Sequence, residues 1–319
     1  MKLLFHCNQC REGTFQESTK NKLECPNCGI HYPIINEIPR IVNLDNYSKS
    51  FGYQWNIFRK TQLDSYSGFP ISKKRLDDLT QWHENVDLTG QLILEAGSGS
   101  GRFTEVLVKT PTTIFSFDYS DAVEANFRNH NEYKNLHLFQ GDIFNIPFKQ
   151  NTFDHVFCLG VLQHTPDPEE AFYCLADQVK FGGYIYFDVY TRSWHHYIHW
   201  KYFLRPITTK INQEKLLKLI SILSPKLIPI ARLLRRLFGR FGARLVPIVE
   251  YSHLGLSKKI NLEWSILDTF DMYSPKHDHP QSKKNVEHWL KTSGFKKIIL
   301  DYGQNGVICK AQKIEKIKG

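Results

Sequence analysis

A glycine-rich turn directly after a short apolar strand is the feature that most constrains this sequence. Residues 92–95 predict a buried strand, and Gly97, Gly99 and Gly101 follow at alternate positions. Glycines so placed allow a tight turn and a close approach of the backbone to a ligand. The helix expected over residues 103–109 would point its first amides at polar or anionic groups. A ligand-binding βα unit is therefore expected, although an ordinary tight βα turn has the same appearance.

Strands and helices alternate after this turn. Further strands are expected at 113–118, 136–140, 153–158 and 183–189, and helices at 122–130 and 168–179. After a long interruption the pattern resumes with a helix at 283–292 and strands at 297–301 and 306–310. This rhythm predicts an α/β fold with a mostly parallel sheet and helices on both faces.

The spacing of the glycines narrows the ligand. A dinucleotide fingerprint reads G-x-G-x-x-G. Here the third glycine falls one position early, and Arg102 stands where the fingerprint requires glycine. NAD and FAD are therefore disfavoured. The chain also lacks G-x-x-x-x-G-K-[ST], which disfavours a nucleoside triphosphatase.

Acidic residues stand at the ends of two later strands. Asp118 ends the second expected strand, and Asp142 follows the third. A carboxylate can accept two hydrogen bonds from a vicinal diol, so Asp118 is a candidate for binding a ribose. The alternatives are a helix cap for Asp118 and a surface turn for Asp142.

Taken together, these segments resemble the class I S-adenosylmethionine (SAM)-dependent methyltransferases. The run from Glu95 to Gly101 resembles motif I of that family, and Gly141-Asp142-Ile143 resembles its adenine-contacting turn. Residues 159–168 resemble the motif after strand four, and Phe181-Gly182-Gly183 resembles the turn before strand five. The resemblance covers about residues 90–190 and implies a Rossmann-like methyltransferase sheet that binds SAM.

The resemblance also implies which residues contact SAM. Asp118 would receive the ribose hydroxyls, and the Asp142 side chain with the next backbone N–H would meet the adenine edge. His164 would contact SAM or the substrate, or it is a loop histidine satisfied by the protein. The full set of expected cofactor contacts is Glu95, Gly97, Ser98, Gly99, Gly101, Asp118, Tyr119, Asp142, Ile143, Leu159 and His164.

Two paired cysteine motifs precede this region. Cys7-x2-Cys10 and Cys25-x2-Cys28 are separated by 14 residues, which is close to the spacing of a four-cysteine zinc ribbon. Four thiolates leave no open coordination position, so the expected zinc is structural. A redox pair is the alternative. The sequence from Leu23 to Pro39 resembles the zinc-ribbon methyltransferase-activator family. Zinc ribbons also precede the catalytic domain in some ribosomal RNA methyltransferases.

Four parts are therefore expected: a zinc-ribbon module at 1–42, linker and lid helices at 43–90, the SAM-binding domain at 91–190 and 282–319, and a mainly helical insertion at 191–281. In the second part, Tyr53 or Trp55 is a candidate to close over the cofactor. Packing against the domain is the alternative for both residues.

The insertion carries the positive charge of the chain. The whole chain has a formal charge of +9, and residues 201–260 hold 13 Lys or Arg against Glu214 and Glu250 alone. Residues 226–245 alternate apolar and basic positions at helical spacing, with Pro229 near the expected start. Three interpretations stay open: peripheral docking on an anionic membrane, gripping phosphates of a lipid-linked or nucleic-acid substrate, or covering the domain.

Candidate bases gather where the insertion re-enters the fold. Methyl transfer to a hydroxyl needs a base to accept the proton. The candidates are His277, His279, Asp271 and Asp268, and His195 and His196 are further candidates of lower rank. A network that stabilises turns is the alternative.

The leading functional hypothesis is SAM-dependent O-methylation of a small-molecule or glycan acceptor, which is lipid-linked in one version. A zinc-ribbon RNA methyltransferase is a second, less favoured hypothesis, and a non-catalytic scaffold or activator is a third. No run of about 18 apolar residues is present, so no transmembrane helix is expected. A cytoplasmic protein, or one peripheral at the inner face of the membrane, is expected.

Overall fold

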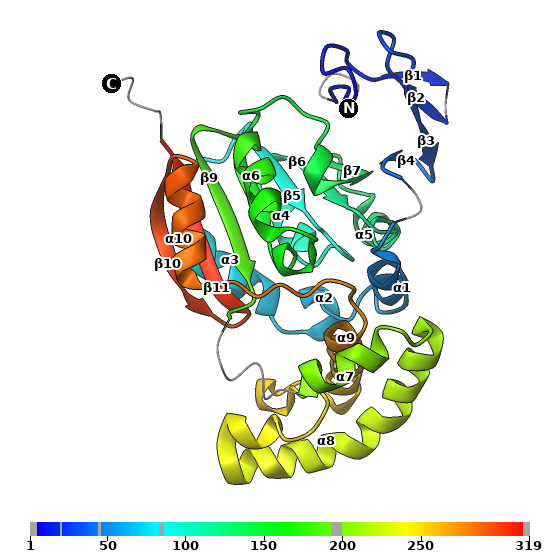
Figure 1. Ribbon diagram of the computed structural model, residues 1–319, viewed down its shortest axis with the longest axis vertical. Helices are drawn as coiled ribbons and strands as arrows, with labels where there is room; N and C mark the ends of the chain where they lie inside the picture. Colours follow the sequence, from blue (N-terminus) through cyan, green and yellow to red (C-terminus); the bar gives the residue numbers. More distant parts are fainter. Residues whose placement is uncertain (1–4, 20, 44–45, 83–85, 193–199, 315–319) are drawn as a thin grey trace.

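The computed structural model describes residues 5–19, 21–43, 46–82, 86–192 and 200–314. Their strands form one eleven-stranded sheet in the order β1-β2-β3-β4-β7-β6-β5-β8-β9-β11-β10 (Figure 1). In this order the strands from β4 to β9 run parallel, whereas β11 is antiparallel to both of its neighbours, β9 and β10. The prediction of a mostly parallel central sheet, with two further strands near the C-terminus, is confirmed.

The central strands are β5 (Leu92–Ala96), β6 (Thr113–Asp118), β7 (Leu136–Gly141), β8 (Phe153–Cys158) and β9 (Val179–Val189). The C-terminal hairpin consists of β10 (Phe295–Gly303) and β11 (Gly306–Lys313). The helices between them are α4 (Thr104–Leu107), α5 (Val123–His130), α6 (Pro168–Gln178) and α10 (Lys283–Thr292). β9 begins four residues before the predicted strand, because the backbone remains paired through an irregularity at Gly182, whose φ is 80°.

Alternation of side chains along the buried strands divides the core between two faces. In β5, Ile93 packs toward α3 (Ile71–Thr80) and α4, whereas Leu94 packs toward the face covered by α6 and α10. Phe157 and Val156 of β8 divide in the same way. Both faces of the sheet are therefore apolar and covered by helices, as a buried parallel sheet requires.

The N-terminal module continues the same sheet. It comprises β1 (Gln16–Thr19), β2 (Lys22–Glu24), β3 (His31–Ile35) and β4 (Ile38–Ile41). Residues 34–42 read as one apolar, strand-like run but form the end of a hairpin, because Asn36 and Glu37 adopt left-handed φ values of 52° and 66° at its turn. Such φ values suit the primed two-residue turns that match the twist of a hairpin.

The module is joined to the central sheet by pairing and by packing. β4 lies parallel to β7, with Ile41 opposite Gly141. The Arg40 guanidinium forms an ion pair with Glu124 of α5 and donates a hydrogen bond of 3.1 Å to Gln140 Oε1. The Phe5 ring packs 5.1 Å from Phe139 in the main core. The ribbon is thus an added edge of the sheet.

α1 (Lys49–Ile57), α2 (Asp64–Ser67) and the insertion cover the end of the sheet below the strands in Figure 1, whereas α3 packs on a face of the sheet. The lid consists of α1, α2 and α3. The insertion consists of α7 (Trp200–Thr208), α8 (Gln213–Ala243), a 3₁₀ turn η4 (Ser252–Leu254) and α9 (Lys258–Tyr273). Of the described helices, none has the length and apolar character needed to cross a bilayer.

The long helix α8 differs from the helix predicted from residue 226. It begins at Gln213, and the Asn212 side chain caps it by accepting hydrogen bonds from the amides of Glu214 and Lys215. Pro225 and Pro229 lie in the interior of the helix. A kink at Phe238 and Gly239 interrupts it near its end. Burial of one face against α9 stabilises the helix despite the prolines, which sequence propensity alone disfavours.

Candidate active site

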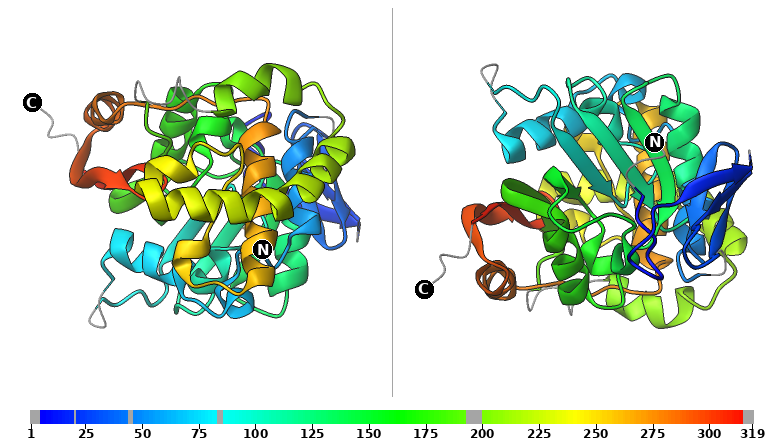
Figure 2. Two further views of the ribbon diagram at one scale, coloured as in Figure 1. Left: turned by 90° about the horizontal axis from the view of Figure 1, so that it is seen from below. Right: turned by 90° about the horizontal axis from the view of Figure 1, so that it is seen from above.

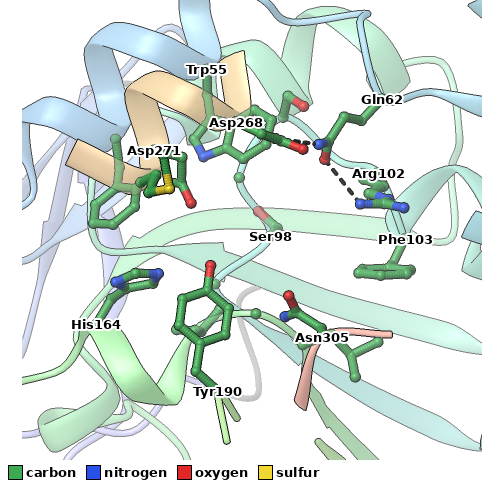
Figure 3. A pocket seen from close by; sticks show the side chains of 18 of the residues that line it. Trp55, Gln62, Ser98, Arg102, Phe103, His164, Tyr190, Asp268, Asp271 and Asn305 are labelled. Carbon is green, nitrogen blue, oxygen red and sulfur yellow. Dashed lines mark hydrogen bonds between the residues drawn. The ribbon is translucent and has the colours of Figure 1, made fainter. Parts of the chain in front are cut away.

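A large cavity lies at the carboxyl ends of the parallel strands. Its volume is about 710 Å³, which is within the range of small-molecule sites. The loops after β5 and β8 form its floor, and these strands lie at the point where the strand order reverses, which is where open α/β sheets bind ligands. α1 and α9 supply the opposite wall with Trp55, Asp268 and Asp271 (Figure 3), and α7 adds Lys201 and Tyr202. The cavity is therefore formed jointly by the sheet, the lid and the insertion.

The glycine loop needs its glycines for conformation and for space. Gly97 has a φ of 74°, and a Cβ there would lie 2.3 Å from Val161 Cγ2. Gly101 has a φ of 90°, and a Cβ there would lie 2.3 Å from Asn126 Oδ1. Neither position accepts a side chain without displacement of its neighbour. Gly97, Ser98 and Gly99 line the cavity, whereas Gly101 faces α5 behind it.

Asp118 fixes the loop while facing the cavity. Its Oδ2 accepts a hydrogen bond of 2.8 Å from the Gly99 amide, and its Oδ1 accepts from the Ser120 amide and hydroxyl. A carboxylate has about four lone-pair directions, so capacity for a further donor remains. Burial raises the pKa of Asp118, and these hydrogen bonds oppose the rise. The residue therefore both holds the loop and can accept from a ligand.

Aromatic residues accompany the second predicted carboxylate. Asp142 lines the cavity and caps a 3₁₀ turn, η1 (Ile143–Asn145), by accepting from the Phe144 amide. The rings of Tyr47 and Tyr119 lie 5.1 Å apart beside it, and both line the cavity. This end offers acceptors, backbone amides and flat apolar surfaces.

Glu95 lies behind the loop and is absent from the cavity lining. Its Oε2 accepts hydrogen bonds from the Thr104 and Ser116 hydroxyls, at 2.5 and 2.7 Å. Burial raises the pKa of Glu95 to about 7. Glu95 Oε1 is buried without a partner in the described structure, and so is Ser98 Oγ, which does line the cavity. A polar ligand group at the loop would satisfy the Ser98 hydroxyl.

Of the two lid aromatics, Trp55 and Tyr53, one faces the site. Trp55 lines the cavity, and a Cβ built at Gly99 would lie 3.3 Å from its indole ring, so the indole covers the glycine loop. Tyr53 instead packs toward Phe270 of α9. α1 thus places Trp55 over the glycine loop and Tyr53 against the insertion.

A series of hydrogen-bonded polar side chains crosses the end of the cavity away from His164 (Figure 3). Arg102 Nη1 donates to Gln62 Oε1, and Gln62 Nε2 donates to Asp268 Oδ1. The Tyr251 hydroxyl donates to the other oxygen of Asp268. Burial raises the pKa of Asp268 to about 6 and lowers that of Arg102 to about 10. Among the described residues Arg102 forms no ion pair, so this end suits an anionic or strongly polar ligand group.

A second arginine at this end is neutralised. Arg75 forms an ion pair with Asp188, which is fully buried at the end of β9. Asp188 Oδ1 also accepts from the Gly160 amide at 2.7 Å and from Asn305 Nδ2 at 3.2 Å. These contacts tie the loop after β8 to the C-terminal hairpin.

His164 is held in one tautomer at the opposite side. Its Nδ1 lies 3.1 Å from the His277 carbonyl oxygen, and since a carbonyl only accepts, Nδ1 carries the hydrogen. Nε2 is then left with a free lone pair. Burial lowers the pKa of His164, and the Asp271 carboxylate opposes this. The ring lies 5.4 Å from that of Tyr190, and both line the cavity.

The predicted bases separate into two pairs. Asp268 and Asp271 of α9 line the cavity, and Asp271 accepts a hydrogen bond of 3.0 Å from Gln54. His277 and His279 are not among the lining residues: the His277 ring packs edge-on against Tyr47. The His279 amide donates to the Gln163 carbonyl. His195 and His196 lie outside the described residues.

Sequence reasoning missed most of the wall opposite the glycine loop. The missed lining residues include Tyr47, Gln62, Arg75, Tyr190, Lys201, Tyr251, Trp264 and Asn305. Lys201 forms an ion pair with Asp278 at 2.7 Å, which connects α7 to the segment before α10. Each of these eight residues comes from a different segment, and their positions in the sequence have no common spacing. Only the position of Tyr190 directly after a strand could have drawn notice.

The four cysteines of the ribbon meet at one point. Their Sγ atoms all lie within 4.8 Å of one another, with Cys7 3.6 Å from Cys28 and Cys10 3.7 Å from Cys25. Gly13 leaves room for this cluster, because a Cβ there would lie 2.6 Å from Cys25 Sγ. Backbone amides of Glu12 and Gly13 lower the pKa of the Cys10 thiol. This set of four thiols suits a structural zinc ion.

Comparison with known proteins agrees with this geometry. Residues 94–187 match the family described as a methyltransferase domain. A ubiquinone biosynthesis O-methyltransferase of Coxiella burnetii (strain Dugway 5J108-111) is 28% identical over 118 residues, covering 36% of this chain and 50% of the relative. Another of that description, from Pasteurella multocida (strain Pm70), is 29% identical over 118 residues, covering 33% and 49%. The chain spans about half the length of these curated relatives.

Among solved structures, a putative SAM-dependent methyltransferase of Methanococcus maripaludis is 16% identical, with coverage of 87% of this chain and 98% of that one and a TM-score of 0.47. The family match, with the loop, Asp118 and Asp142 in place, shows a class I SAM-dependent methyltransferase domain. SAM is the cofactor of this domain, and the unpartnered Ser98 hydroxyl and the free acceptor capacity of Asp118 fit its polar groups.

Proposed function

We propose that the protein transfers a methyl group from SAM to a hydroxyl oxygen of a small-molecule or glycan acceptor. The observation that carries this proposal is the cavity itself. One part is lined by the glycine loop, Asp118 and Asp142, and the remainder is enclosed by the lid and the insertion. When bound, SAM supplies an electrophilic methyl group on its sulfonium sulfur, and the enclosed remainder is the space for an acceptor.

Positioning and exclusion of water account for much of catalysis in such a site. Trp55 covers the glycine loop, and Tyr190 and Trp264 supply aromatic walls for a flat or apolar acceptor. Arg102 would bind an anionic or strongly polar group, whether the carboxylate of the methyl donor or an acid on the acceptor. The acceptor would thus be held between aromatic surfaces and a cationic end.

His164 is the residue best placed to take the proton of a hydroxyl. The His277 carbonyl holds its Nδ1–H, which leaves Nε2 as a hydrogen-bond acceptor at the cavity. Burial lowers its pKa, so the imidazole is neutral near pH 7 and able to accept a proton. Asp271 raises the pKa of His164 and would stabilise the imidazolium that forms. The O-methyltransferase names of the curated relatives support oxygen as the methylated atom.

Substitution of Asp118 tests the donor half of the proposal. Asp118→Ala removes an acceptor for the Gly99 amide and for the ligand, so the dissociation constant for SAM is expected to rise at least about tenfold. Isothermal titration calorimetry on zinc-loaded protein measures it. Asp118→Asn keeps one acceptor oxygen and should give an intermediate value. Equal affinity in all three proteins would overturn the assignment of Asp118, and no binding of SAM by the intact protein would overturn the function.

Substitution of His164 tests the base. His164→Gln is expected to lower kcat about 100-fold or more with unchanged SAM affinity, because glutamine cannot accept the proton. Transfer of label from methyl-tritiated SAM to a panel of phenols, catechols and methyl glycosides measures it, and added imidazole should restore part of the rate. An unaffected kcat would exclude His164 as the base. SAM binding without transfer to any hydroxyl would contradict O-methylation and favour a scaffold.

A further inference from the structure

The long helix α8 exposes an apolar face that nothing in the described structure covers. One face packs through Leu216, Ile220, Ile228 and Ala231 onto the rest of the insertion. On the opposite side, large apolar side chains recur at helical spacing and are 40 to 70% exposed. We call them the docking face: Leu219, Ile222, Leu223, Ile230, Leu233, Leu237 and Phe241. Contiguous exposed apolar surface of this kind marks an interaction site.

Basic side chains share the exposed side of α8. Lys215, Lys218, Lys226, Arg232 and Arg236 are all exposed, and Glu214 is the only acid in the helix. Among the described residues Arg235 is the α8 cation that pairs with an acid, Glu250. The remaining positive charge of the helix is therefore not neutralised by an acid of the described chain. An apolar stripe flanked by unneutralised cations is complementary to an anionic lipid surface.

The docking face lies on the outside of the molecule. Viewed from below, α8 crosses the front of the molecule with the sheet behind it (Figure 2, left). α7, which precedes α8 in the sequence, adds two exposed apolar side chains, Phe203 and Ile207, which are 63 and 64% exposed. A flat membrane surface can therefore reach α8 without obstruction by the ribbon, whose strands lie at the far end in Figure 1.

The docking face meets the cavity at one end. Trp200 at the start of α7 donates a hydrogen bond of 3.0 Å to the Leu245 carbonyl beyond α8. Lys201 and Arg244, the neighbours of these two residues, line the cavity. Phe241, Leu245 and Trp200 are exposed at this same junction. The wall of the acceptor space is thus continuous with the exposed apolar surface.

We propose that α8 docks the protein on an anionic phospholipid surface, with the apolar docking face in the headgroup–acyl boundary and its cations on the lipid phosphates. This proposal does not depend on O-methylation being correct. Where both hold, the junction at Trp200 and Leu245 would let an acceptor embedded in the membrane reach the cavity.

Co-sedimentation with vesicles tests the proposal on the full-length, zinc-loaded chain. Vesicles of phosphatidylglycerol and phosphatidylcholine are expected to sediment the protein, and pure phosphatidylcholine much less. Leu233→Ser/Leu237→Ser/Phe241→Ser should weaken binding at least about tenfold by removing buried apolar area. Lys218→Gln/Lys226→Gln/Arg236→Gln should weaken binding to the anionic vesicles at least about tenfold.

A matched control separates the docking face from exposed apolar residues in general. Ile35, Ile57 and Ile298 are 41, 49 and 45% exposed on other surfaces, so replacing all three by serine should leave vesicle binding unchanged. SAM affinity, measured by calorimetry, should be equal in every variant, which shows that each folds. Equal sedimentation of the triple apolar variant and the wild type would overturn the proposal. So would binding of polyuridylate with no binding of vesicles, or a dimer in light scattering that the same three serines dissociate.

Discussion

Loss of zinc is expected to unfold the ribbon and to weaken SAM binding at a distance. In Cys25→Ser one of the four thiols is replaced at a fully buried position. The small ribbon buries few apolar side chains of its own, and structural zinc contributes on the order of 10 kcal/mol to folding in isolated zinc-finger peptides. The amides of β1–β4 should therefore lose most of their protection against hydrogen exchange.

The effect should reach the cavity through the edge of the sheet. Ile41 of β4 pairs with Gly141, which immediately precedes Asp142. Arg40 donates to Gln140 Oε1, and Gln140 Nε2 donates at 3.0 Å to the carbonyl of Tyr119, which lines the cavity. Unfolding of β4 frees this end of the site, so SAM affinity is expected to fall at least about tenfold.

Elemental analysis, hydrogen exchange and calorimetry measure the three parts of this prediction. The wild type should contain one zinc ion per chain and Cys25→Ser none. Cys174→Ser is the matched control, because Cys174 is a partly buried cysteine on α6 outside the cluster. Full exchange protection of β1–β4 in the metal-free variant would show that the ribbon is held by packing alone. Unchanged SAM affinity with an unfolded ribbon would show that β4 does not support the site.

A single methyl group added at Gly97 is expected to weaken SAM binding strongly. In Gly97→Ala the new Cβ would lie 2.3 Å from Val161 Cγ2, so either the glycine loop or the loop after β8 must move. The left-handed φ of 74° adds strain of about 1 kcal/mol or more for alanine. Both loops line the cavity, and SAM affinity should fall about 100-fold or more.

A second substitution separates the clash from the strain. Val161→Ala removes the two methyl groups that lie 2.3 and 2.8 Å from the added Cβ. The double variant Gly97→Ala/Val161→Ala should therefore recover much of the affinity, while Val161→Ala alone should change it little. Calorimetry of the four proteins completes the cycle. Additive losses would show that the two residues do not interact, and that backbone strain alone explains the defect.

Local sequence patterns were sufficient for the strands that are buried on both faces. β6 and β8 occupy the residues expected for them, because short apolar runs between turns have few other solutions in a folded chain. The cysteine pairs also meet as expected, because C-x-x-C spacing brings two thiols together locally. The start of α8 was misjudged: Pro229 suggests a helix start, whereas packing against α9 keeps both prolines inside the helix.

The residues of the candidate site likewise fall into those that local sequence patterns indicate and those that only tertiary packing brings together. Gly97, Gly99, Asp118, Asp142 and Leu159 line the cavity because each follows or ends a parallel strand, and the carboxyl ends of these strands meet at one edge. The histidines at 277 and 279 are equally apt for catalysis by residue type, yet neither lines the cavity in the folded chain. Asp268 and Asp271 reach the cavity because both lie on the inward side of α9, which no spacing in the sequence reveals.

The sequence by itself determined the methyltransferase domain, the glycine-rich loop after its first strand and the four thiols of a zinc ribbon, because each depends on residues close together in the chain. Only the tertiary structure decided that the ribbon extends the catalytic sheet, that Arg102 stands without an acid partner among the described residues, and that His164 has a free Nε2. These features arise where segments distant in the chain meet, and their contacts depend on packing that local periodicity does not encode.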